Sequence, residues 1–339
     1  MEKILLKACR REKTYRTPIW LMRQAGRFMP GYQEIRKKVG FLELCKNPDL
    51  AAQVTVLAVE KLGVDAAIIF SDILVIVEAL GFQLTFAKDH GPVIGNPFRR
   101  KEDLKKISGK DVNSKLGFVF DAIRLARRNL KTEIPLIGFA GAPFTVASYL
   151  IEGGKSTDFS LTKKMMTDSP ENWDHLMNTL GEATAEYLKS QIEAGAEALQ
   201  LFDTWAGVLS LEQYRKYVLP HLKKIISGVD KKVPVIYFGL NTFPLFPGIM
   251  ELGVDVVSVD SNTSLTNAWE ILGDVALQGN FDPRILLTDE KRIKAEAKRI
   301  LSEVNGRPGH IFNLGHGVLP QTPVGNVRFL VDFVKEESA

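Results

Sequence analysis

The chain has little cysteine, no excess of one charge and no long hydrophobic run. Its 339 residues include two cysteines, too few for a disulfide framework or a cysteine-rich metal site. The 44 basic residues nearly balance the 40 acidic ones, and the lysines stand singly or in short pairs, without the dense basic stripe of a nucleic-acid binder. No apolar run approaches the roughly 20 residues of a membrane span. These absences predict a cytoplasmic protein that binds neither nucleic acid nor membrane.

What the sequence has instead is an alternation of short apolar runs with longer segments of helical periodicity. The runs, rich in Ile, Val and Phe, predict eight strands: Ile19–Met22, Ala66–Phe70, Leu136–Phe139, Ala198–Phe202, Val233–Phe238, Val254–Val259, Val275–Leu277 and His310–Leu314. Helices are predicted at Leu50–Leu62, Val112–Leu130, Glu171–Ala194, Leu211–Ser227, Pro244–Leu252, Leu265–Leu272, Glu290–Val304 and Val324–Val334. Eight alternating units with uninterrupted apolar strands predict an α/β fold, the closed (β/α)8 TIM barrel.

We predict a single catalytic domain over residues 1–339. Such barrels average about 250 residues, which leaves room for an N-terminal extension and an insertion. The segment Gly81–Arg100, with its glycine and proline turns, predicts a β-hairpin insertion over one end of the barrel. A doubly wound open sheet is the alternative, less favoured because no Gly-x-Gly-x-x-Gly motif follows the first strand.

Three arginines follow the first predicted strand at close spacing. Arg23, Arg27 and Arg36 stand near Gln24, Gly26 and Tyr32, directly after a core-like apolar run. They are either ordinary surface residues or a cluster that binds carboxylate or phosphate, because guanidinium groups hold planar anions through paired hydrogen bonds. Their position after a buried strand favours anion binding.

In this architecture the active site lies at the carboxyl ends of the strands, where two further candidates occur. Asp72 lies within an almost wholly apolar segment, where an unpaired charge is unfavourable; it is either a functional carboxylate or a cap of a turn. His316 lies between Gly315 and Gly317, which would allow close approach of the backbone to a ligand; it is otherwise a hydrogen-bonded loop histidine. We find no zinc motif and no Gly-x-Ser-x-Gly elbow. The arginine-rich mouth of the predicted barrel indicates an anionic ligand with several carboxylates.

At these residues the sequence closely resembles the uroporphyrinogen decarboxylase family. The matching motifs, in family order, are PIWLMRQAGR at 18–27, DAAIIFSDIL at 65–74, GFAGAPFTVASYLIEGG at 138–154, ALQLFDTWAG at 198–207, LQGNFDP at 277–283 and NLGHG at 313–317. The resemblance implies a (β/α)8 barrel, a homodimer, no cofactor and no metal. It also implies the decarboxylation of the four acetate side chains of uroporphyrinogen III, which gives coproporphyrinogen III in haem biosynthesis.

The resemblance further implies roles for individual residues. Arg23 and Arg27 would bind substrate carboxylates with help from Arg36, and Asp72 would accept hydrogen bonds from the pyrrole N–H groups. Tyr149 and His316 join Asp72 and Arg23 as the expected catalytic residues, while the proton donor remains open among Arg23, His316 and water. The remaining expected substrate contacts are Gln24, Ala25, Gly26, Phe41, Phe202 and Thr204, the last a threonine where many relatives carry serine.

Two alternatives share much of this pattern. Related cobalamin-dependent methyltransferases use the same barrel but bind zinc through a His-x-Cys pair after a middle strand, where this chain reads Tyr237-Phe238-Gly239. A non-catalytic tetrapyrrole carrier would present the same pocket without the reaction.

Overall fold

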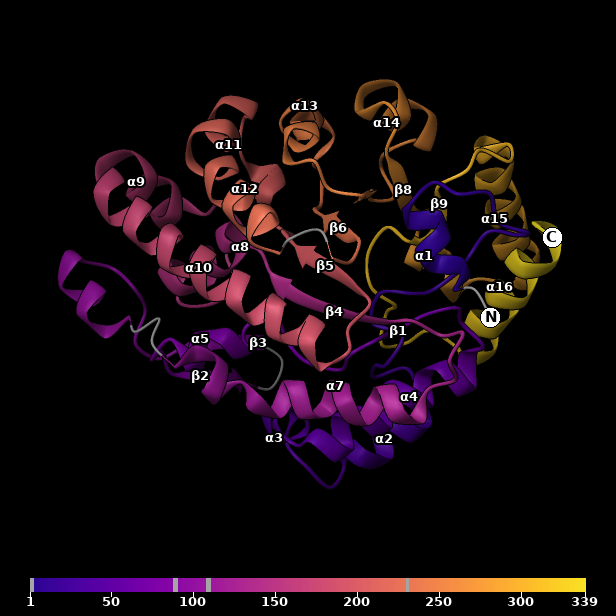
Figure 1. Ribbon diagram of the computed structural model, residues 1–339, viewed down its shortest axis with the longest axis horizontal. Coiled ribbons are helices and arrows are strands. Elements are labelled where there is room, and N and C mark those ends of the chain that lie inside the picture. Colours follow the sequence, from indigo (N-terminus) through magenta and orange to yellow (C-terminus); the bar gives the residue numbers. More distant parts are fainter. Residues whose placement is uncertain (1–2, 88–90, 108–110, 230–231) are drawn as a thin grey trace.

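Seven parallel strands form one curved sheet with helices outside it (Figure 1). The computed structural model describes residues 3–87, 91–107, 111–229 and 232–339. The sheet order is β1-β4-β5-β6-β7-β8-β9. The strands are β1 (Ala67–Ile68), β4 (Leu136–Gly141), β5 (Ala198–Phe202), β6 (Val235–Phe238), β7 (Val256–Ser258), β8 (Ala276–Phe281) and β9 (His310–Leu314).

The segment after Thr17 closes the sheet into a barrel. Ile19 forms a parallel bridge with Phe312 on β9, and Phe312 N–H donates to the Pro18 carbonyl at 2.8 Å. On the other side, Asp65 N–H donates to the Ile19 carbonyl at 2.8 Å, just before β1. This segment therefore occupies the eighth position between β9 and β1, and the predicted (β/α)8 barrel is confirmed.

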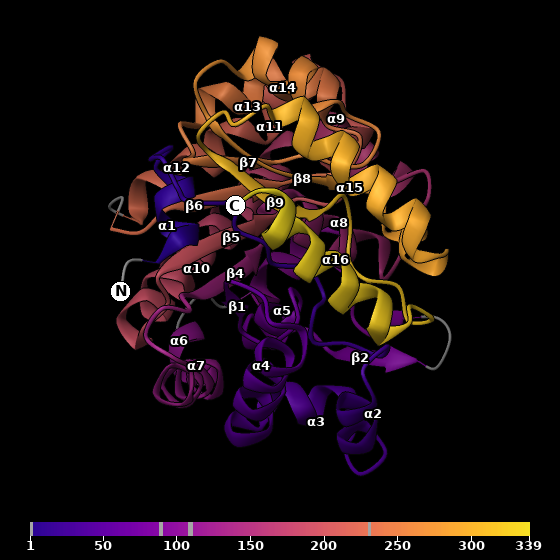
Figure 2. The same cartoon turned by 90° about the vertical axis from the view of Figure 1, so that its right-hand side faces the viewer.

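The helices cover the outside of the barrel, where α15 and α16 run side by side (Figure 2). They are α1 (Ile4–Cys9), α2 (Pro30–Arg36), α3 (Phe41–Lys46), α4 (Pro48–Leu62), α5 (Val75–Ala79), α6 (Val112–Lys115), α7 (Gly117–Asn129), α8 (Pro143–Glu152), α9 (Ser160–Asp168), α10 (Pro170–Ala194), α11 (Leu211–Tyr217), α12 (Leu219–Gly228), α13 (Phe246–Ile249), α14 (Leu265–Leu272), α15 (Glu290–Val304) and α16 (Val324–Glu337). Short 3₁₀ helices are η1 (Lys101–Lys106), η2 (Ala206–Val208), η3 (Phe243–Leu245), η4 (Met250–Leu252) and η5 (Pro283–Leu287). None of the described helices is long and apolar enough to cross a membrane.

Local chemistry explains where several helices begin and end. At the start of α4 the Asn47 side chain accepts a hydrogen bond from Leu50 N–H, and Pro48 occupies the first turn, where its missing N–H is not needed. The same helix ends at Gly63 with φ of 71°, a left-handed conformation that glycine adopts without strain. α10 ends in the same way at Gly195.

Several predicted elements are shorter or interrupted in the structure; the predicted helix Pro244–Leu252, for example, consists of η3, α13 and η4. The predicted strand Ile19–Met22 is only the bridge at Ile19, because the chain turns after Trp20 and Gln24 N–H bonds back to the Leu21 carbonyl. The predicted helix Leu211–Ser227 is two helices, α11 and α12, interrupted at Val218 just before Pro220. The predicted helix Val112–Leu130 is also two helices, α6 and α7, interrupted at Leu116 before Gly117.

The predicted hairpin insertion is present. β2 (Leu84–Ala87) pairs antiparallel with β3 (Gly91–Ile94), and the connection between them, 88–90, lies outside the described residues. The hairpin rests on the end of α8, because Ile94 N–H donates to the Gly153 carbonyl at 2.9 Å and Val93 bridges Gly154. The insertion therefore lies beside the helix that carries Tyr149.

The barrel interior contains a buried layer of hydrogen-bonded polar side chains. Trp20 Nε1 donates to Gln278 Oε1 at 2.8 Å, and Gln278 Nε2 donates to Gln200 at 3.1 Å and to Ser258 at 3.0 Å. Each of these four side chains thus has a hydrogen-bond partner, as buried polar groups in stable interiors generally do. The layer fixes the closing segment against β5, β7 and β8.

Candidate active site

Arg23 stands at the tip of the turn that follows the closing segment. Gln24 is 1% exposed, and its side chain ties the turn down by accepting from Leu21 N–H at 3.1 Å and donating to the Ala66 carbonyl at 3.0 Å. Arg23 has φ of 62°, a left-handed conformation uncommon for residues other than glycine, and its side chain is exposed between buried neighbours. The guanidinium is therefore presented by a rigid turn.

The glycines that flank His316 make room for neighbouring protein groups. A Cβ on Gly317 would lie 2.3 Å from Arg23 Cδ, and a Cβ on Gly315 would lie 2.2 Å from Ser261 N. The sequence suggested that these glycines admit a ligand, but the space beside Gly317 is taken by the Arg23 side chain. Val318 N–H also donates to the Met22 carbonyl at 2.9 Å, which holds the two loops together.

Asp72 follows β1, and its carboxylate and the Arg23 guanidinium shift each other's pKa through their opposite charges. Its carboxylate accepts a hydrogen bond from Leu74 N–H at 2.9 Å, so it also caps the turn that leads into α5. Burial raises the pKa of Asp72 to about 6, while the Leu74 hydrogen bond and the charge of Arg23 act in the opposite direction. The sequence left Asp72 as either a functional carboxylate or the cap of a turn. The structure makes the two compatible, since the same carboxylate caps the turn and interacts with Arg23.

Tyr149 comes from α8 and joins the same pair. Burial raises the pKa of Tyr149 to about 12; Asp72 adds to that shift and Arg23 opposes it. At neutral pH the side chain is therefore a phenol that can donate a hydrogen bond. Asp72, Arg23 and Tyr149 come from three separated parts of the chain and influence one another at the same end of the barrel.

His316 lies beyond the end of β9, on the other side of Arg23. Its ring stacks on that of Phe238, with centroids 6.2 Å apart and planes inclined by 16°. Burial lowers the pKa of His316 to about 4, and the charge of Arg23 adds to the effect. The imidazole is accordingly neutral near pH 7, a hydrogen-bonding group and not a ready acid.

Aromatic rings line the strand ends next to these polar groups. Phe202, at the end of β5, contacts Phe139 and Phe238 edge to face, with centroid distances of 5.5 and 5.9 Å. Tyr149 packs on Trp205 with ring centroids 4.0 Å apart. These surfaces suit a ligand with flat rings.

A second aromatic group lies near the hairpin. Phe41 packs against Phe86 on β2 at 4.7 Å and against Phe70 at 6.2 Å, and the guanidinium of Arg36 lies 5.8 Å from the centre of the Phe41 ring. Arg36 also donates to the Val39 carbonyl. Part of the hydrogen-bonding capacity of Arg36 is therefore used within its own loop.

The remaining predicted contacts differ in how much of each side chain is open to a ligand. Arg27 is exposed and close enough to lower the pKa of Arg23. Thr204 is half-buried after β5, whereas the Gln24 amide is used to anchor the turn. Ala25 and Gly26 complete that turn; a Cβ on Gly26 would lie 2.9 Å from the Arg23 carbonyl oxygen.

Sequence reasoning placed Phe41 and Phe202 in the site only through the family resemblance. Phe139 and Phe238 lie within apolar strands and are 8% and 1% exposed, so they pack behind Phe202 as core residues. Trp205, directly after Thr204, was not among the predicted contacts, although its place after β5 puts it at the active-site end of the barrel. Among the described residues, no three His, Cys, Asp or Glu side chains are grouped closely enough to hold a metal ion.

Comparison with known proteins gives one consistent family. The sequence profile of the family described as Uroporphyrinogen decarboxylase (URO-D) matches residues 2–337. The protein named uroporphyrinogen decarboxylase from Carboxydothermus hydrogenoformans is 49% identical over 100% of this chain and 97% of its own length. Its namesake from Chloroflexus aggregans is 48% identical over 97% of this chain and 94% of its own length.

Solved structures agree on the fold. A methyltransferase from Methanosarcina mazei superposes with a TM-score of 0.83 at 24% identity, covering 99% of both chains. A putative vitamin-B12-independent methionine synthase from Listeria monocytogenes gives a TM-score of 0.61 at 14% identity, covering 96% of this chain and 98% of its own. At these identities the likeness is one of fold, and it carries no methyl transfer to this chain.

Proposed function

The chain belongs to the uroporphyrinogen decarboxylase family, and we propose that it removes carbon dioxide from the four acetate side chains of uroporphyrinogen III to give coproporphyrinogen III. The observation that carries the proposal is the mutual electrostatic influence of Asp72, Arg23 and Tyr149 at one end of the barrel. This arrangement combines a cation for substrate carboxylates with a buried carboxylate for the pyrrole nitrogens.

Substrate binding would use the charged and aromatic groups together. Arg23 and Arg27 lie close to each other at the mouth of the barrel, where their guanidinium groups would bind the carboxylates of a poly-acid. Phe202 and Trp205, both half-buried, would contact the flat pyrrole rings. Since the substrate carries both features, the two kinds of surface support the same ligand.

Asp72 would stabilise the positive charge that the reaction creates. A proton added to a pyrrole carbon makes the ring a cation, and this cation accepts the electrons of the C–C bond as carbon dioxide leaves. The exocyclic methylene then takes a proton and the ring carbon gives one up, so each acetate consumes one proton and becomes a methyl group. With a pKa of about 6, Asp72 is mostly ionised at pH 7 and would face the cation with a preorganised negative charge.

The pKa shifts bear on the choice of proton donor. A neutral His316 is poorly suited to that role in the free protein. Desolvation of the guanidinium, with a contribution from the charge of Arg27, lowers the pKa of Arg23 although the residue as a whole is exposed, and this makes the group a somewhat better acid. We therefore propose Arg23, or a water molecule that it holds, as the donor, with Tyr149 and His316 as hydrogen-bonding groups on the substrate.

The decisive experiment is an assay of carbon dioxide release from uroporphyrinogen III under anaerobic conditions, with the product's carboxyl groups counted after oxidation. The proposal expects four carbon dioxide molecules per substrate without added metal or cofactor. Tight binding of uroporphyrinogen without release of carbon dioxide would instead identify a tetrapyrrole carrier. The purified protein should also be tested for zinc by elemental analysis, because bound zinc would favour the methyltransferase alternative.

We further propose that the protein works as a homodimer in the cytoplasm. Dimerisation is expected from the family resemblance, and light scattering tests it: a mass near 37.8 kDa would identify a monomer. Both cysteines, Cys9 and Cys45, are buried free thiols, which suits a reducing compartment.

A further inference from the structure

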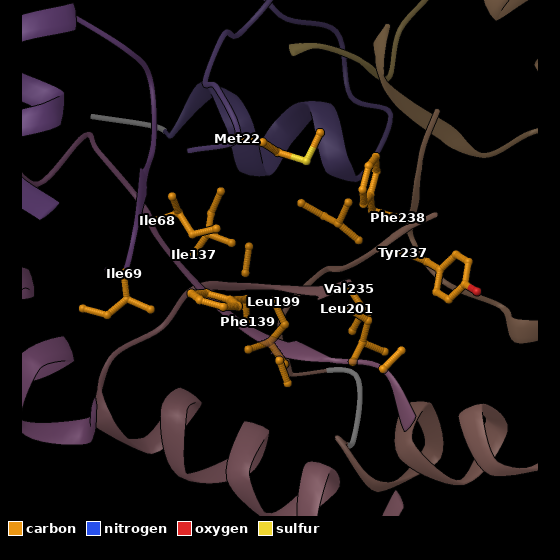
Figure 3. Packing of buried hydrophobic residues seen from close by; sticks show 14 of the residues in the cluster. Met22, Ile68, Ile69, Ile137, Phe139, Leu199, Leu201, Val235, Tyr237 and Phe238 are labelled. Atoms are coloured by element: carbon orange, nitrogen blue, oxygen red, sulfur yellow. The ribbon is translucent and has the colours of Figure 1, made fainter. Parts of the chain in front are cut away.

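Behind the barrel wall lies a buried carboxylate that the proposed reaction does not use. Asp203 follows β5 and is 0% exposed. Successive strand residues point to opposite faces, and the inward-facing Phe202 and Phe238 rings contact each other, so Tyr237 points outward. Figure 3 shows the Tyr237 hydroxyl turned away from Met22 and the strand residues around it. The Asp203 carboxylate accepts a hydrogen bond from this hydroxyl in the layer between the strands and the helices.

Asp203 is the acceptor at the centre of a small hydrogen-bond network. Thr145 Oγ1 on α8 and the Tyr237 hydroxyl on β6 each donate to its carboxylate at 2.8 Å. The Tyr214 hydroxyl on α11 donates in turn to the Tyr237 hydroxyl at 3.3 Å. Burial raises the pKa of Asp203 to about 6, whereas the two donors lower it. Above that pH an ionised Asp203 satisfies both donors, and a buried charge held in this way is rigid.

The network leads to Tyr149 by two routes. Thr145 lies four residues before Tyr149, so the two side chains are one turn apart on the same face of α8. The Thr145 hydroxyl also accepts a hydrogen bond from Trp205 N–H at 3.2 Å, and the Trp205 ring packs on the Tyr149 ring. One hydroxyl thus fixes both the helix that carries the phenol and the indole that supports it.

We propose that Asp203 and Thr145 are positioning residues, which hold the Tyr149 phenol in place by clamping α8 and Trp205 to the end of β5. Thr204 lies between Asp203 and Trp205 in the chain, so the clamp also fixes the turn that presents its hydroxyl. Neither Asp203 nor Thr145 touches substrate in this arrangement. The expected effect on kcat rests on the proposed function, whereas the contacts that hold α8 and Trp205 do not.

The kinetic test is a double-mutant cycle between Thr145 and Tyr149. Thr145→Val keeps the shape but removes the hydroxyl, and we expect kcat to fall roughly ten- to a hundredfold, on the scale of a small misplacement of a catalytic group, with KM changed less. Thr145→Ser restores the hydroxyl and should recover activity to within about threefold of the parent. In a Tyr149→Phe background, Thr145→Val should have little further effect, because a positioning residue acts through the group it positions.

The matched control is Ser148→Ala. Ser148 is a buried hydroxyl on the same helix that donates to the Phe144 carbonyl of its own helix at 2.8 Å, so its loss should leave kcat within about threefold of the parent. Losses that multiply in the Thr145→Val, Tyr149→Phe double variant, or a Thr145→Val variant that behaves like Ser148→Ala, would overturn the proposal.

A second measurement works without substrate. Hydrogen exchange of the folded protein should show faster exchange in peptides that span 203–206 in Thr145→Val and Asp203→Asn, but not in Ser148→Ala. Unchanged exchange in both variants would show that the clamp does not exist. If the parent releases no carbon dioxide, the proposed function fails while hydrogen exchange still decides whether Thr145 and Asp203 hold this turn.

Discussion

Among the described residues, the desolvated Asp72 carboxylate accepts one hydrogen bond, donated by Leu74 N–H of its own turn. Because Asp72→Asn keeps the shape and removes the charge, we expect kcat for uroporphyrinogen to fall at least about a hundredfold, the scale of losing one preorganised electrostatic contact. Binding of the product, measured separately, should change much less. Turnover within a few fold of the parent would remove Asp72 from the mechanism.

The raised pKa of Asp72 predicts the pH dependence of the reaction. Because the ionised form is the active one in our proposal, kcat/KM should fall below a pH of about 6 as the carboxylate takes up a proton. The charge of Arg23 lowers this pKa, so in Arg23→Gln the acidic limb should move to higher pH. Burial also raises the pKa of Asp203 to about 6. If the fall in kcat/KM at low pH persists unchanged in Asp72→Asn, it must be assigned to Asp203 instead.

Gly317 offers a test of the Arg23 side chain that leaves its charge in place. A Cβ at this position would lie 2.3 Å from Arg23 Cδ, so in Gly317→Ala the arginine must move. We expect KM for uroporphyrinogen to rise roughly tenfold or more, since a displaced guanidinium loses its paired geometry. Gly325→Ala is the control, because nothing lies within 4 Å of the Cβ it would add. Equal KM values for the two variants would contradict the placement of Arg23.

How well single residues of the site could be predicted depended on their chemistry. Asp72 and Arg23 were identifiable because a charge beside a buried strand is unusual in a sequence, and the structure brings the two under each other's influence. Phe202 was identified only through the family resemblance, because an aromatic residue in a strand looks the same whether it lines a pocket or fills a core. Its role in substrate binding remains a prediction.

At the level of elements, the hairpin and α3 form one aromatic contact near the site. Phe86 on β2 packs against Phe41, which lies between Phe70 and the Arg36 guanidinium. Phe86→Ala should raise KM about two- to tenfold with little change in kcat, because an aromatic pair contributes about 0.5–1.5 kcal/mol beyond its buried area. Val93→Ala, an exposed position on β3, is the control. A fall in kcat without a change in KM would show that the hairpin serves the chemistry rather than binding.

Helices with one polar and one apolar face were predictable from the sequence, whereas helices buried on nearly every side were not. α14 and α15 have the predicted bounds, since their apolar positions recur at helical spacing. α8, which carries Tyr149, has buried residues on nearly every side and therefore no such spacing. The sequence pattern therefore predicts no helix over Pro143–Glu152.

For the molecule as a whole, barrel closure depends on a buried ion pair at the end opposite the site. Arg16 donates to both oxygens of Asp65 at 2.7 Å, and Asp65 also accepts from Ile19 N–H at 2.9 Å. Arg16→Ala removes the bidentate partner of Asp65 and leaves it with Lys335, whose Nζ lies 3.2 Å from Asp65 Oδ1, so we expect the free energy of unfolding in urea to fall by about 2 kcal/mol, less than the loss for a charge left with no partner.

The control for that measurement is Arg124→Ala. Arg124 pairs with Asp121 on the surface of α7, where both side chains are more than half exposed, at 51% and 59%. The loss of such a pair should change stability by less than about 1 kcal/mol. Equal losses in the two variants would mean that the Arg16–Asp65 pair does not stabilise barrel closure.

The number of strands in the barrel was predictable, but the way it closes was not. Eight repeated units are visible in sequence because each strand must be buried and each helix must cover it. Closure rests on contacts such as that between Pro18 and Phe312, which lie at opposite ends of the chain. No local pattern signals a contact of that kind.

The hydrogen bond from Thr17 N–H to Ser338 Oγ, at 3.1 Å, places the last turn of α16 against the start of the closing segment. An affinity tag fused directly after Ala339, or trimming of the final residues, therefore acts only a few residues upstream of Arg23. A purification tag at that end should therefore be attached through a spacer. Tagged and cleaved samples should be compared before a raised KM is attributed to any substitution.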